Sequence, residues 1–473
     1  MNPRNSDSWL VIGAGAAGLG AALELREAGA EFEVWEASER AGGVVGTLEQ
    51  GAFRFESGPN TVPAGAEQVR WLAAGFGAAD RLVTSSDRAR DRFLFHAGRL
   101  QPVPLRPPQL LGTRLLSPLG KLRLLREPSK GFGFEPNGKE PSVYEFVAQR
   151  FGKQAADRFA GAFVRGIFAG DPKLLGLRSA FPRVWNLACE HRSVLRGMKA
   201  AAQASTLSRE ERGKLLAFQG GFGALCEAAE RSLGEQLQRG LAVTGIEREG
   251  ERWRVRSATG RTAVFDRVVL ATPAPVAAAL LESLAPQLSS ELRSIRVASV
   301  HVLHLGFASR DALGLPLGFG FLVPPEAGAR APRMLGTIFA SDLFDDRAPQ
   351  GGAALSLIYN AQDLDAAAGP GSSPEGLQEV ALEDLRRAGA TPGPAVEFAH
   401  ERWDSALPQY EVGHDLRIGR VRAEGRGLPG IELAGNYLRG IGLNDSIASG
   451  REAARVDSDT PPDRAHPAEG ARR

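Results

Sequence analysis

The chain has 473 residues, with 57 lysines and arginines against 55 aspartates and glutamates, and therefore a formal net charge of +2. This length is sufficient for about two or three domains, and a composition of 43% hydrophobic and 24% charged residues excludes wholesale disorder. The near-neutral charge argues against a dedicated nucleic-acid-binding protein, so no nucleic acid is expected among the partners. Only two cysteines occur, Cys189 and Cys226, which argues against a disulfide scaffold and a cysteine-based zinc site and fits a reducing cytoplasm.

The longest uncharged segment near the N-terminus, Ser8 to Leu23, is shorter than the about 18 apolar residues of a membrane-spanning helix. It contains an apolar strand, then Gly13-Ala14-Gly15-Ala16-Ala17-Gly18, and then a helical pattern. A second strand, 32–35, delivers Glu36 at its end. This arrangement is typical of a dinucleotide site, because the glycines permit a tight turn beside a pyrophosphate and the acid can accept ribose hydroxyls. These residues alone leave FAD and NAD both open.

The next segment, Glu36-Ala37-Ser38-Glu39-Arg40-Ala41-Gly42-Gly43, resembles the ExxxRxGG extension of glutathione-reductase-like flavoproteins, especially the flavin amine oxidase and phytoene desaturase superfamily. The resemblance favours FAD and implies that Ala37 lies at the cofactor. It also implies that Arg40 meets the pyrophosphate, a role that suits a guanidinium, and that Gly43 and Val44 pass close to the cofactor.

The C-terminal part, 431–455, reads as a strand, a glycine-rich turn and a helix. In this superfamily such a segment returns the chain to the flavin, and the resemblance therefore places four residues at the cofactor: Asn436, Ile441, Gly442 and Leu443. Asn444 or Asp445 is the expected N-cap of the final helix. Because both ends of the chain then belong to one Rossmann-type domain, that domain is discontinuous, and Val243 in its middle part is expected near the adenine.

Five more segments closely resemble the oxygen-dependent, FAD-containing protoporphyrinogen oxidases over nearly the full chain. They are Gly58-Pro59-Asn60 with the following Thr61, Arg92–Phe95 with Gly98–Leu100, Gly166–Pro172, Gly318–Pro324, and Pro408–Tyr410 with Gly413-His414. The family implies the six-electron oxidation of protoporphyrinogen IX to protoporphyrin IX in heme biosynthesis, with non-covalent FAD as the hydride acceptor, O2 as the oxidant and H2O2 as a product. The loop Gly58, Pro59, Asn60 and Thr61 is then expected at the flavin.

The same resemblance assigns substrate contacts. Arg92 is expected to pair with a propionate, Phe319 and Leu322 to enclose the macrocycle, and Gly320 to offer its backbone between them. No acid or base residue is assigned, because the flavin accepts the hydride and pyrrole protons can leave to solvent. His301 and His304 lie on a predicted strand with a spacing of three, which puts them on opposite faces and excludes a shared metal.

The expected fold is mixed α/β and α+β, with a discontinuous FAD domain, a mixed-sheet substrate domain and a helical lobe. The predicted parts are 1–90, 216–275 and 425–456 for FAD, 91–215 for the lobe, 276–424 for the substrate and 457–473 for a flexible tail. Residues 81–130 hold 11 Lys and Arg against three acids, and leucines are interleaved with them. These residues either lie on an anionic membrane or pack their leucines inward.

The expected location is cytoplasmic, with peripheral contact at the inner face of the cell membrane; the family also suggests hand-off of product to ferrochelatase and a homodimer. Three other functions stay open. Coproporphyrinogen III, with four propionates, would suit a more cationic cavity. Amine oxidation is disfavoured because Tyr437 is the only aromatic residue of the closing motif. A non-enzymatic relative, similar to the Rab GDP-dissociation inhibitors, is disfavoured by the intact nucleotide motif.

Overall fold

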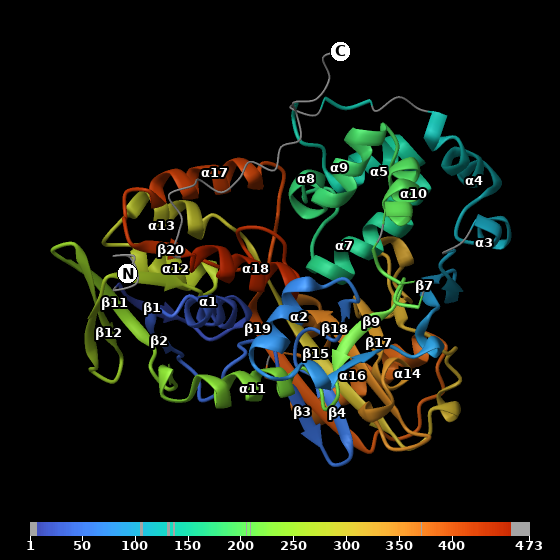
Figure 1. Cartoon of the computed structure of the whole chain (residues 1–473). Coiled ribbons are helices and arrows are strands. Elements are labelled where there is room, and N and C mark those ends of the chain that lie inside the picture. Colours follow the sequence, from blue (N-terminus) through green and yellow to red (C-terminus); the bar gives the residue numbers. More distant parts are fainter. Residues whose placement is uncertain are drawn as a thin grey trace.

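The computed structural model describes residues 7–455, except 105–106, 130–132, 136–137, 205, 209 and 370. The expected tail, 457–473, lies outside the described residues. In Figure 1 an α/β unit that contains the first strands lies beside a unit built on a large sheet, and a cluster of helices lies above that sheet.

The first unit is built on a parallel five-stranded sheet whose strands come from both ends of the chain. In spatial order the strands are β10 (Leu237–Gln238), β2 (Glu31–Trp35), β1 (Ser8–Ile12), β14 (Arg267–Leu270) and β20 (Ile431–Leu433). The central strand β1 is almost entirely apolar and buried, as expected for a parallel sheet covered on both faces.

Helices from distant parts of the chain cover this sheet. They are α1 (Ala16–Glu27), α2 (Glu67–Gly75), α11 (Gly223–Leu233), α12 (Ala274–Leu281), α13 (Pro286–Arg293), α17 (His414–Gly425) and α18 (Leu443–Ala453). The first and the last of them pack backbone to backbone. A Cβ at Gly450 would lie 1.7 Å from the Ala17 carbonyl oxygen, and one at Gly20 would lie 2.5 Å from that of Ile447. Both glycines therefore permit this close contact.

An antiparallel three-stranded sheet flanks the parallel one. It consists of β11 (Val243–Glu249), β12 (Arg252–Ser257) and β13 (Thr262–Phe265). In β12 buried and exposed residues alternate strictly, with Trp253 and Val255 facing the core that this sheet shares with the parallel one.

The second unit is a seven-stranded mixed sheet. In spatial order its strands are β19 (Glu397–Pro408), β15 (Val297–Phe307), β18 (Ala353–Asn360), β17 (Gly336–Phe339), β16 (Gly320–Leu322), β7 (Arg92–His96) and β8 (Arg99–Pro102). Residues 92–102 belong to this sheet, because β7 pairs in parallel with β16. The expected helical lobe, 91–215, therefore began too early in the chain. One face packs on α15 (Ala361–Ala368) and α16 (Pro374–Arg387), and α14 (Ala340–Leu343) follows β17.

Two small sheets connect the units. They are the hairpin β3 (Thr47–Gln50) and β4 (Phe53–Glu56), and the three strands β5 (Val62–Pro63), β9 (Leu215–Phe218) and β6 (Leu82–Thr84).

The helical lobe above the large sheet contains α3 (Pro107–Gly112), α4 (Pro118–Leu125), α5 (Val143–Phe151), α6 (Lys153–Ala155), a π-helical turn (Ala156–Ala160), α7 (Gly161–Phe168), α8 (Leu177–Ala180), α9 (Pro182–His191) and α10 (Val194–Ala204). No helix within the described residues combines the length and the apolar character needed to cross a membrane.

Candidate functional site

The glycine turn between β1 and α1 leaves space for a ligand at the start of the helix. Gly13 has φ +97°, and a Cβ there would lie 2.8 Å from the Ala271 carbonyl oxygen. Gly18 lies against the turn, because its Cβ would be 1.8 Å from the Gly13 oxygen. Gly15 differs, since a Cβ there would meet no atom within 4 Å, and it begins α1 without a side-chain cap. The first N–H groups of α1, including those of Ala16 and Ala17, can therefore bind a phosphate.

Glu36 connects the end of β2 to this turn. Its Oε2 accepts a hydrogen bond from the Ala14 N–H over 2.6 Å, and its Oε1 accepts from Ser38 N–H over 2.9 Å. The side chain is 9% exposed, and Ala37 beside it is exposed. A carboxylate has about four acceptor positions, so Glu36 can still accept from a ribose.

Arg40 supports the loop that follows. Its guanidinium donates to the carbonyls of Val45 and Gly43 over 2.9 and 2.8 Å, while the Gly42 N–H donates to the Ala14 carbonyl over 2.8 Å. Val44 is 42% exposed on this loop. The fixed loop therefore lies beside the glycine turn, where the pyrophosphate is predicted.

The predicted flavin loop, Gly58 to Thr61, lies against the same segment. A Cβ at Gly58 would be 2.3 Å from the Val44 carbonyl oxygen, and Pro59 follows at this contact. Asn60 donates to the Gly58 carbonyl over 3.1 Å, but its buried Oδ1 has no hydrogen-bond donor within the described residues. Leaving a buried acceptor unpaired is costly, so this oxygen fits a site completed by a ligand N–H such as a flavin supplies.

The closing segment after β20 returns to this region. Asn436 donates to the Ala406 carbonyl over 3.2 Å. Gly442, not Asn444 or Asp445, is the N-cap of α18, and no side chain caps it. The expected N-cap was wrong because Asn444 Oδ1 instead accepts from the Gln68 N–H over 2.9 Å. The uncapped start of α18 leaves N–H groups that stabilise nearby negative charge.

Ile441 and Leu443, also predicted at the cofactor, contribute to the packing of the closing segment. Ile441 packs on the core of the helical lobe, and Leu443 is 9% exposed at the first turn of α18. Val243, at the start of β11, is half-buried against the core shared with the parallel sheet. Its contact with adenine stays a prediction.

The four predicted substrate residues lie on, or directly before, the paired strands β7 and β16, near one edge of the seven-stranded sheet. Arg92 and Gly320 are register partners on β7 and β16, and the Arg92 guanidinium lies 5.1 Å from the centre of the Phe319 ring. Leu322 packs with Leu94 beneath the helical lobe. Gly320 has φ +141°, and a Cβ there would lie 2.0 Å from a backbone oxygen, so the fold alone requires glycine.

Arg92 is a cation that has no acidic partner among the described residues. Burial lowers its pKa from the ordinary arginine value, but an arginine stays charged at neutral pH. Its guanidinium donates a hydrogen bond to the Arg90 carbonyl over 3.4 Å, and within the described part of the chain it forms no ion pair. A half-buried, unpaired guanidinium beside an aromatic ring suits a carboxylate on an otherwise apolar ligand.

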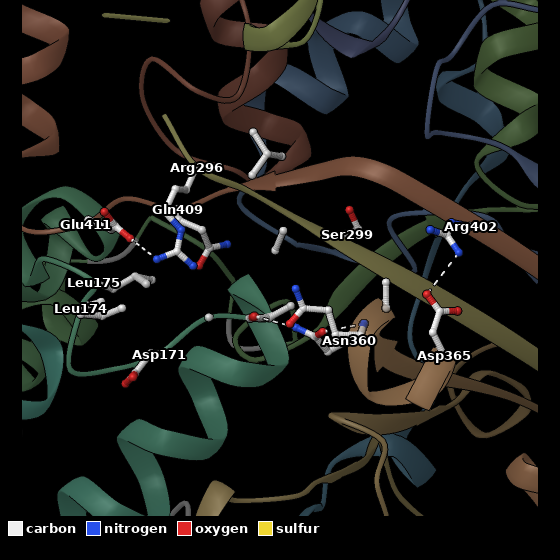
Figure 2. A pocket seen from close by; sticks show the side chains of 16 residues that line it. Asp171, Leu174, Leu175, Arg296, Ser299, Asn360, Asp365, Arg402, Gln409 and Glu411 are labelled. Atoms are coloured by element: carbon white, nitrogen blue, oxygen red, sulfur yellow. Dashed lines mark hydrogen bonds and ion pairs between the residues drawn. The ribbon is translucent and has the colours of Figure 1, made fainter. Parts of the chain in front are cut away.

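A polar cavity of about 310 Å³ lies where the end of α7 meets the ends of β15, β18 and β19, away from Arg92 (Figure 2). None of the predicted site residues lines it. Its two arginines are already paired, Arg296 with Glu411 over 2.9 Å and Arg402 with Asp365 over 3.4 Å. This cavity is therefore less suited to a carboxylate than the surface around Arg92.

Sequence reasoning missed the residues that hold the flavin loop and the closing segment. Trp403 Nε1 donates to the Ser57 carbonyl over 2.8 Å, and Glu56 beside it is buried. Tyr410 and His414 contact the closing segment through its backbone carbonyls. Tyr410 and His414 belong to a segment that resembles the family, and this resemblance was the signal by which the sequence could have pointed to them.

Known proteins resemble this chain over most of its length. A model of the family described as flavin containing amine oxidoreductase matches residues 16–456. The chain is 33% identical to protoporphyrinogen oxidase of Homo sapiens, covering 94% of this chain and 97% of the human one. It is 30% identical to the chloroplastic protoporphyrinogen oxidase of Nicotiana tabacum, covering 94% and 84%.

Solved structures show the same architecture. A crystal structure from Exiguobacterium sp. 255-15, whose name gives protoporphyrinogen oxidase as a provisional assignment, superposes with a TM-score of 0.80 at 26% identity, over 94% of this chain and 97% of that one. Reduced UDP-galactopyranose mutase, at 16% identity, has a TM-score of 0.71 over 95% of both chains and shares the fold. The expected mixed α/β fold class is thereby confirmed, and the chain belongs to the family of flavin containing amine oxidoreductases.

Proposed function

We propose that this flavoprotein oxidises protoporphyrinogen IX to protoporphyrin IX in heme biosynthesis, with FAD as cofactor, O2 as electron acceptor and H2O2 as product. The observation that carries the proposal is the unpaired Arg92 guanidinium beside the Phe319 ring, on a sheet edge lined by Leu322. It offers one cation and an apolar surface to a macrocycle with propionates on one side. The names of the curated relatives support the same substrate.

In the proposed complex the phosphates lie at the N-terminus of α1, Glu36 accepts the ribose hydroxyls, and Asn60 accepts a flavin N–H. Bound FAD supplies the acceptor for the hydride that leaves the substrate. The chain itself orients the macrocycle through Arg92 and excludes water with Phe319 and Leu322. In this proposal no side chain acts as an acid or a base. Residues 1–90, 216–275 and 425–456 are proposed to form the FAD-binding domain.

We infer that the flavin is bound without a covalent link. Cys226 is 5% exposed, its Sγ lies 3.6 Å from the Val45 carbonyl oxygen, and burial raises its pKa to about 12. Cys189 packs in the helical lobe and burial raises its pKa as well. A thiol that stays protonated is a poor nucleophile. Denaturation of the yellow protein should therefore release all of its flavin as free FAD.

The decisive experiment is aerobic turnover of protoporphyrinogen IX and coproporphyrinogen III side by side, measured by porphyrin fluorescence with added FAD. Preference for protoporphyrinogen IX supports the proposal. Preference for coproporphyrinogen III would favour the second candidate, which the basic surplus of residues 81–130 keeps open. Oxidation of neither substrate by a flavin-loaded protein would contradict both.

We also propose that α4 contacts an anionic membrane. Leu119, Leu122 and Leu125 are 58%, 41% and 59% exposed on this helix, and Arg123 and Arg126 beside them are exposed as well. The leucines of the region divide between the two expected arrangements, since Leu110, Leu115 and Leu116 pack inward. Exposed leucines next to arginines suit the surface of an anionic bilayer.

A further inference from the structure

A buried ion pair lies next to the predicted flavin loop and has no role in the function proposed above. Arg347 Nη2 lies 2.9 Å from Glu56 Oε1, and the two side chains are 1% and 2% exposed. Burying two charges often costs more free energy than their attraction returns, so such a pair is weak evidence for stability. Its other contacts indicate its role.

The pair joins three segments that are far apart in the chain. Glu56 ends β4, and the N–H of Phe222, just before α11, donates to its Oε2 over 3.0 Å. Arg347 lies between α14 and β18, and its Nη2 also donates to the Phe218 carbonyl over 3.2 Å. The two side chains thus hold the two ends of the turn between β9 and α11.

Two neighbouring side chains strengthen the same junction. Asp346 Oδ2 accepts from the Gly220 N–H over 2.7 Å. The Thr47 hydroxyl donates to Glu56 Oε2 over 2.9 Å and accepts from the Gly223 N–H over the same distance. Three N–H groups of the turn, those of Gly220, Phe222 and Gly223, are therefore held by Glu56 and its neighbours, which leaves little freedom for Glu56.

Glu56 also lies two residues before the predicted flavin loop. The next residue, Ser57, accepts a hydrogen bond through its carbonyl from Trp403 Nε1 of β19 over 2.8 Å. Arg347 belongs to the connection between β17 and β18 of the same sheet. Trp403 of the seven-stranded sheet and Arg347 of one of its connections therefore hold the segment that leads into the loop Gly58–Thr61.

We propose that Glu56 and Arg347 are positioning residues that set the distance between the loop Gly58–Thr61 and the sheet edge that carries Arg92 and Leu322. The inference rests on the proposed function, in which the loop holds the flavin and the sheet edge holds the porphyrinogen. Both side chains act through the loop backbone and touch neither ligand. Because reaction rates depend steeply on the alignment of the reacting atoms, a displaced loop lowers turnover more than affinity.

The test compares Glu56→Gln and Arg347→Met with Glu127→Gln. The last variant breaks a buried pair of the same kind in the helical lobe, where Arg150 and Glu127 are 2% and 0% exposed. All three variants are expected to melt at lower temperature. Only the first two are expected to lower kcat per bound FAD, by about tenfold or more, with KM changed by less than about twofold. They should also alter the circular dichroism of the bound flavin, which Glu127→Gln should leave unchanged.

A double variant, Glu56→Gln with Arg347→Met, removes both charges of the pair, so it carries the test if a single variant does not fold. Asp346, which pairs with Arg347 over 2.6 Å, loses this partner but is 26% exposed and also accepts from the Gly220 N–H. Its kcat per bound FAD is expected to stay low. Wild-type kcat and flavin dichroism in this variant would show that the pair is only structural and would overturn the proposal. If wild-type protein oxidises no porphyrinogen, the proposed function fails, yet the dichroism of Glu56→Gln against Glu127→Gln still decides the positioning role.

Discussion

The rings of Tyr410 and His414 stack with their centroids 4.2 Å apart, and both side chains hold the closing segment. The Tyr410 hydroxyl donates to the Asn436 carbonyl, and His414 Nε2 donates to the Tyr437 carbonyl over 2.9 Å. A carbonyl only accepts, so the His414 proton lies on Nε2, and its buried Nδ1 has no partner within the described residues. The neutral imidazole thus fixes the backbone next to the predicted flavin.

This arrangement makes stability depend on pH. Burial lowers the pKa of His414 from 6.5 to about 4. Between these values the unfolded chain binds a proton that the folded chain rejects, so the stability from neutral His414 is fully present above pH 6.5 and is lost as the pH falls through 4. Between pH 7 and 4, wild type should lose roughly 2–3 kcal/mol more unfolding free energy than His414→Gln. Urea unfolding across this range measures it, and equal losses in both proteins would contradict it.

Removal of the Arg92 charge should affect substrate affinity before it affects the cofactor. Arg92→Gln is expected to raise KM about tenfold or more, because a charge-assisted hydrogen bond to a propionate is lost, with FAD content unchanged. Steady-state kinetics with measured flavin occupancy check this. Arg90→Gln is the matched control, since Arg90 is exposed and paired with Asp87 over 3.0 Å. Equal kinetics for both variants would remove Arg92 from the site.

Two glycines of the nucleotide turn should respond differently to alanine. Gly15→Ala meets no atom within 4 Å, so the cofactor-free protein should keep its unfolding free energy within about 0.5 kcal/mol while FAD affinity falls at least about tenfold. In Gly18→Ala the new Cβ would lie 1.8 Å from the Gly13 oxygen, so stability itself should fall by about 3 kcal/mol or more. Denaturant unfolding of the cofactor-free protein measures the stability of each variant, and FAD titration measures its affinity for the cofactor. Undiminished FAD affinity in Gly15→Ala would place the pyrophosphate elsewhere.

The end of α7 offers a stabilising change. Ala169 adopts φ 49° and ψ 31°, a left-handed conformation that costs free energy for any residue with a Cβ. Ala169→Gly should therefore raise the free energy of unfolding by about 0.5–1 kcal/mol. Ala202→Gly, at an exposed position of α10, should lower it by about 1 kcal/mol. Denaturant titration compares the unfolding free energies of the two variants. If Ala169→Gly lowered the stability as Ala202→Gly does, the backbone at Ala169 would not be strained.

The exposed leucines of α4 provide a test of membrane contact. The protein should float with anionic vesicles at low salt and release at high salt, because the attraction of basic residues to lipid is screened. Replacing Leu119, Leu122 and Leu125 by glutamate should abolish flotation without changing turnover in solution. Wild-type protein that stays at the bottom of the gradient at low salt would contradict the proposal.

Local patterns were the part of the fold that the sequence could predict. The glycine turn and Glu36 were predictable because a phosphate site needs fixed residues over a short stretch of backbone. The alternation of a strand predicted opposite faces for His301 and His304. This is confirmed, because His301 stacks on His400, while His304 stacks on Phe55.

Partners distant in sequence could not be predicted. Glu56 and Arg347 are 291 positions apart, and each could have paired with many other charges. The same limit explains the strand β7, whose parallel partner β16 lies in a different part of the chain. It also explains the misplaced cap, since Asn444 found a distant backbone N–H in Gln68 instead of a local one.

The strand order of the parallel sheet constrains when the protein can fold during synthesis. Strand β14 lies between β1 and β20, and α18 packs on α1. The sheet that begins at Ser8 is therefore completed only when Leu433 has been translated, and its helical cover only when Ala453 has been translated. Until then the apolar faces of β1 and α1 lack their final cover, and such exposed apolar surface is prone to aggregation. A ribosome that stops before β20 releases a chain that cannot form the complete nucleotide site. Assembly of that site therefore requires a chain that has been translated through α18.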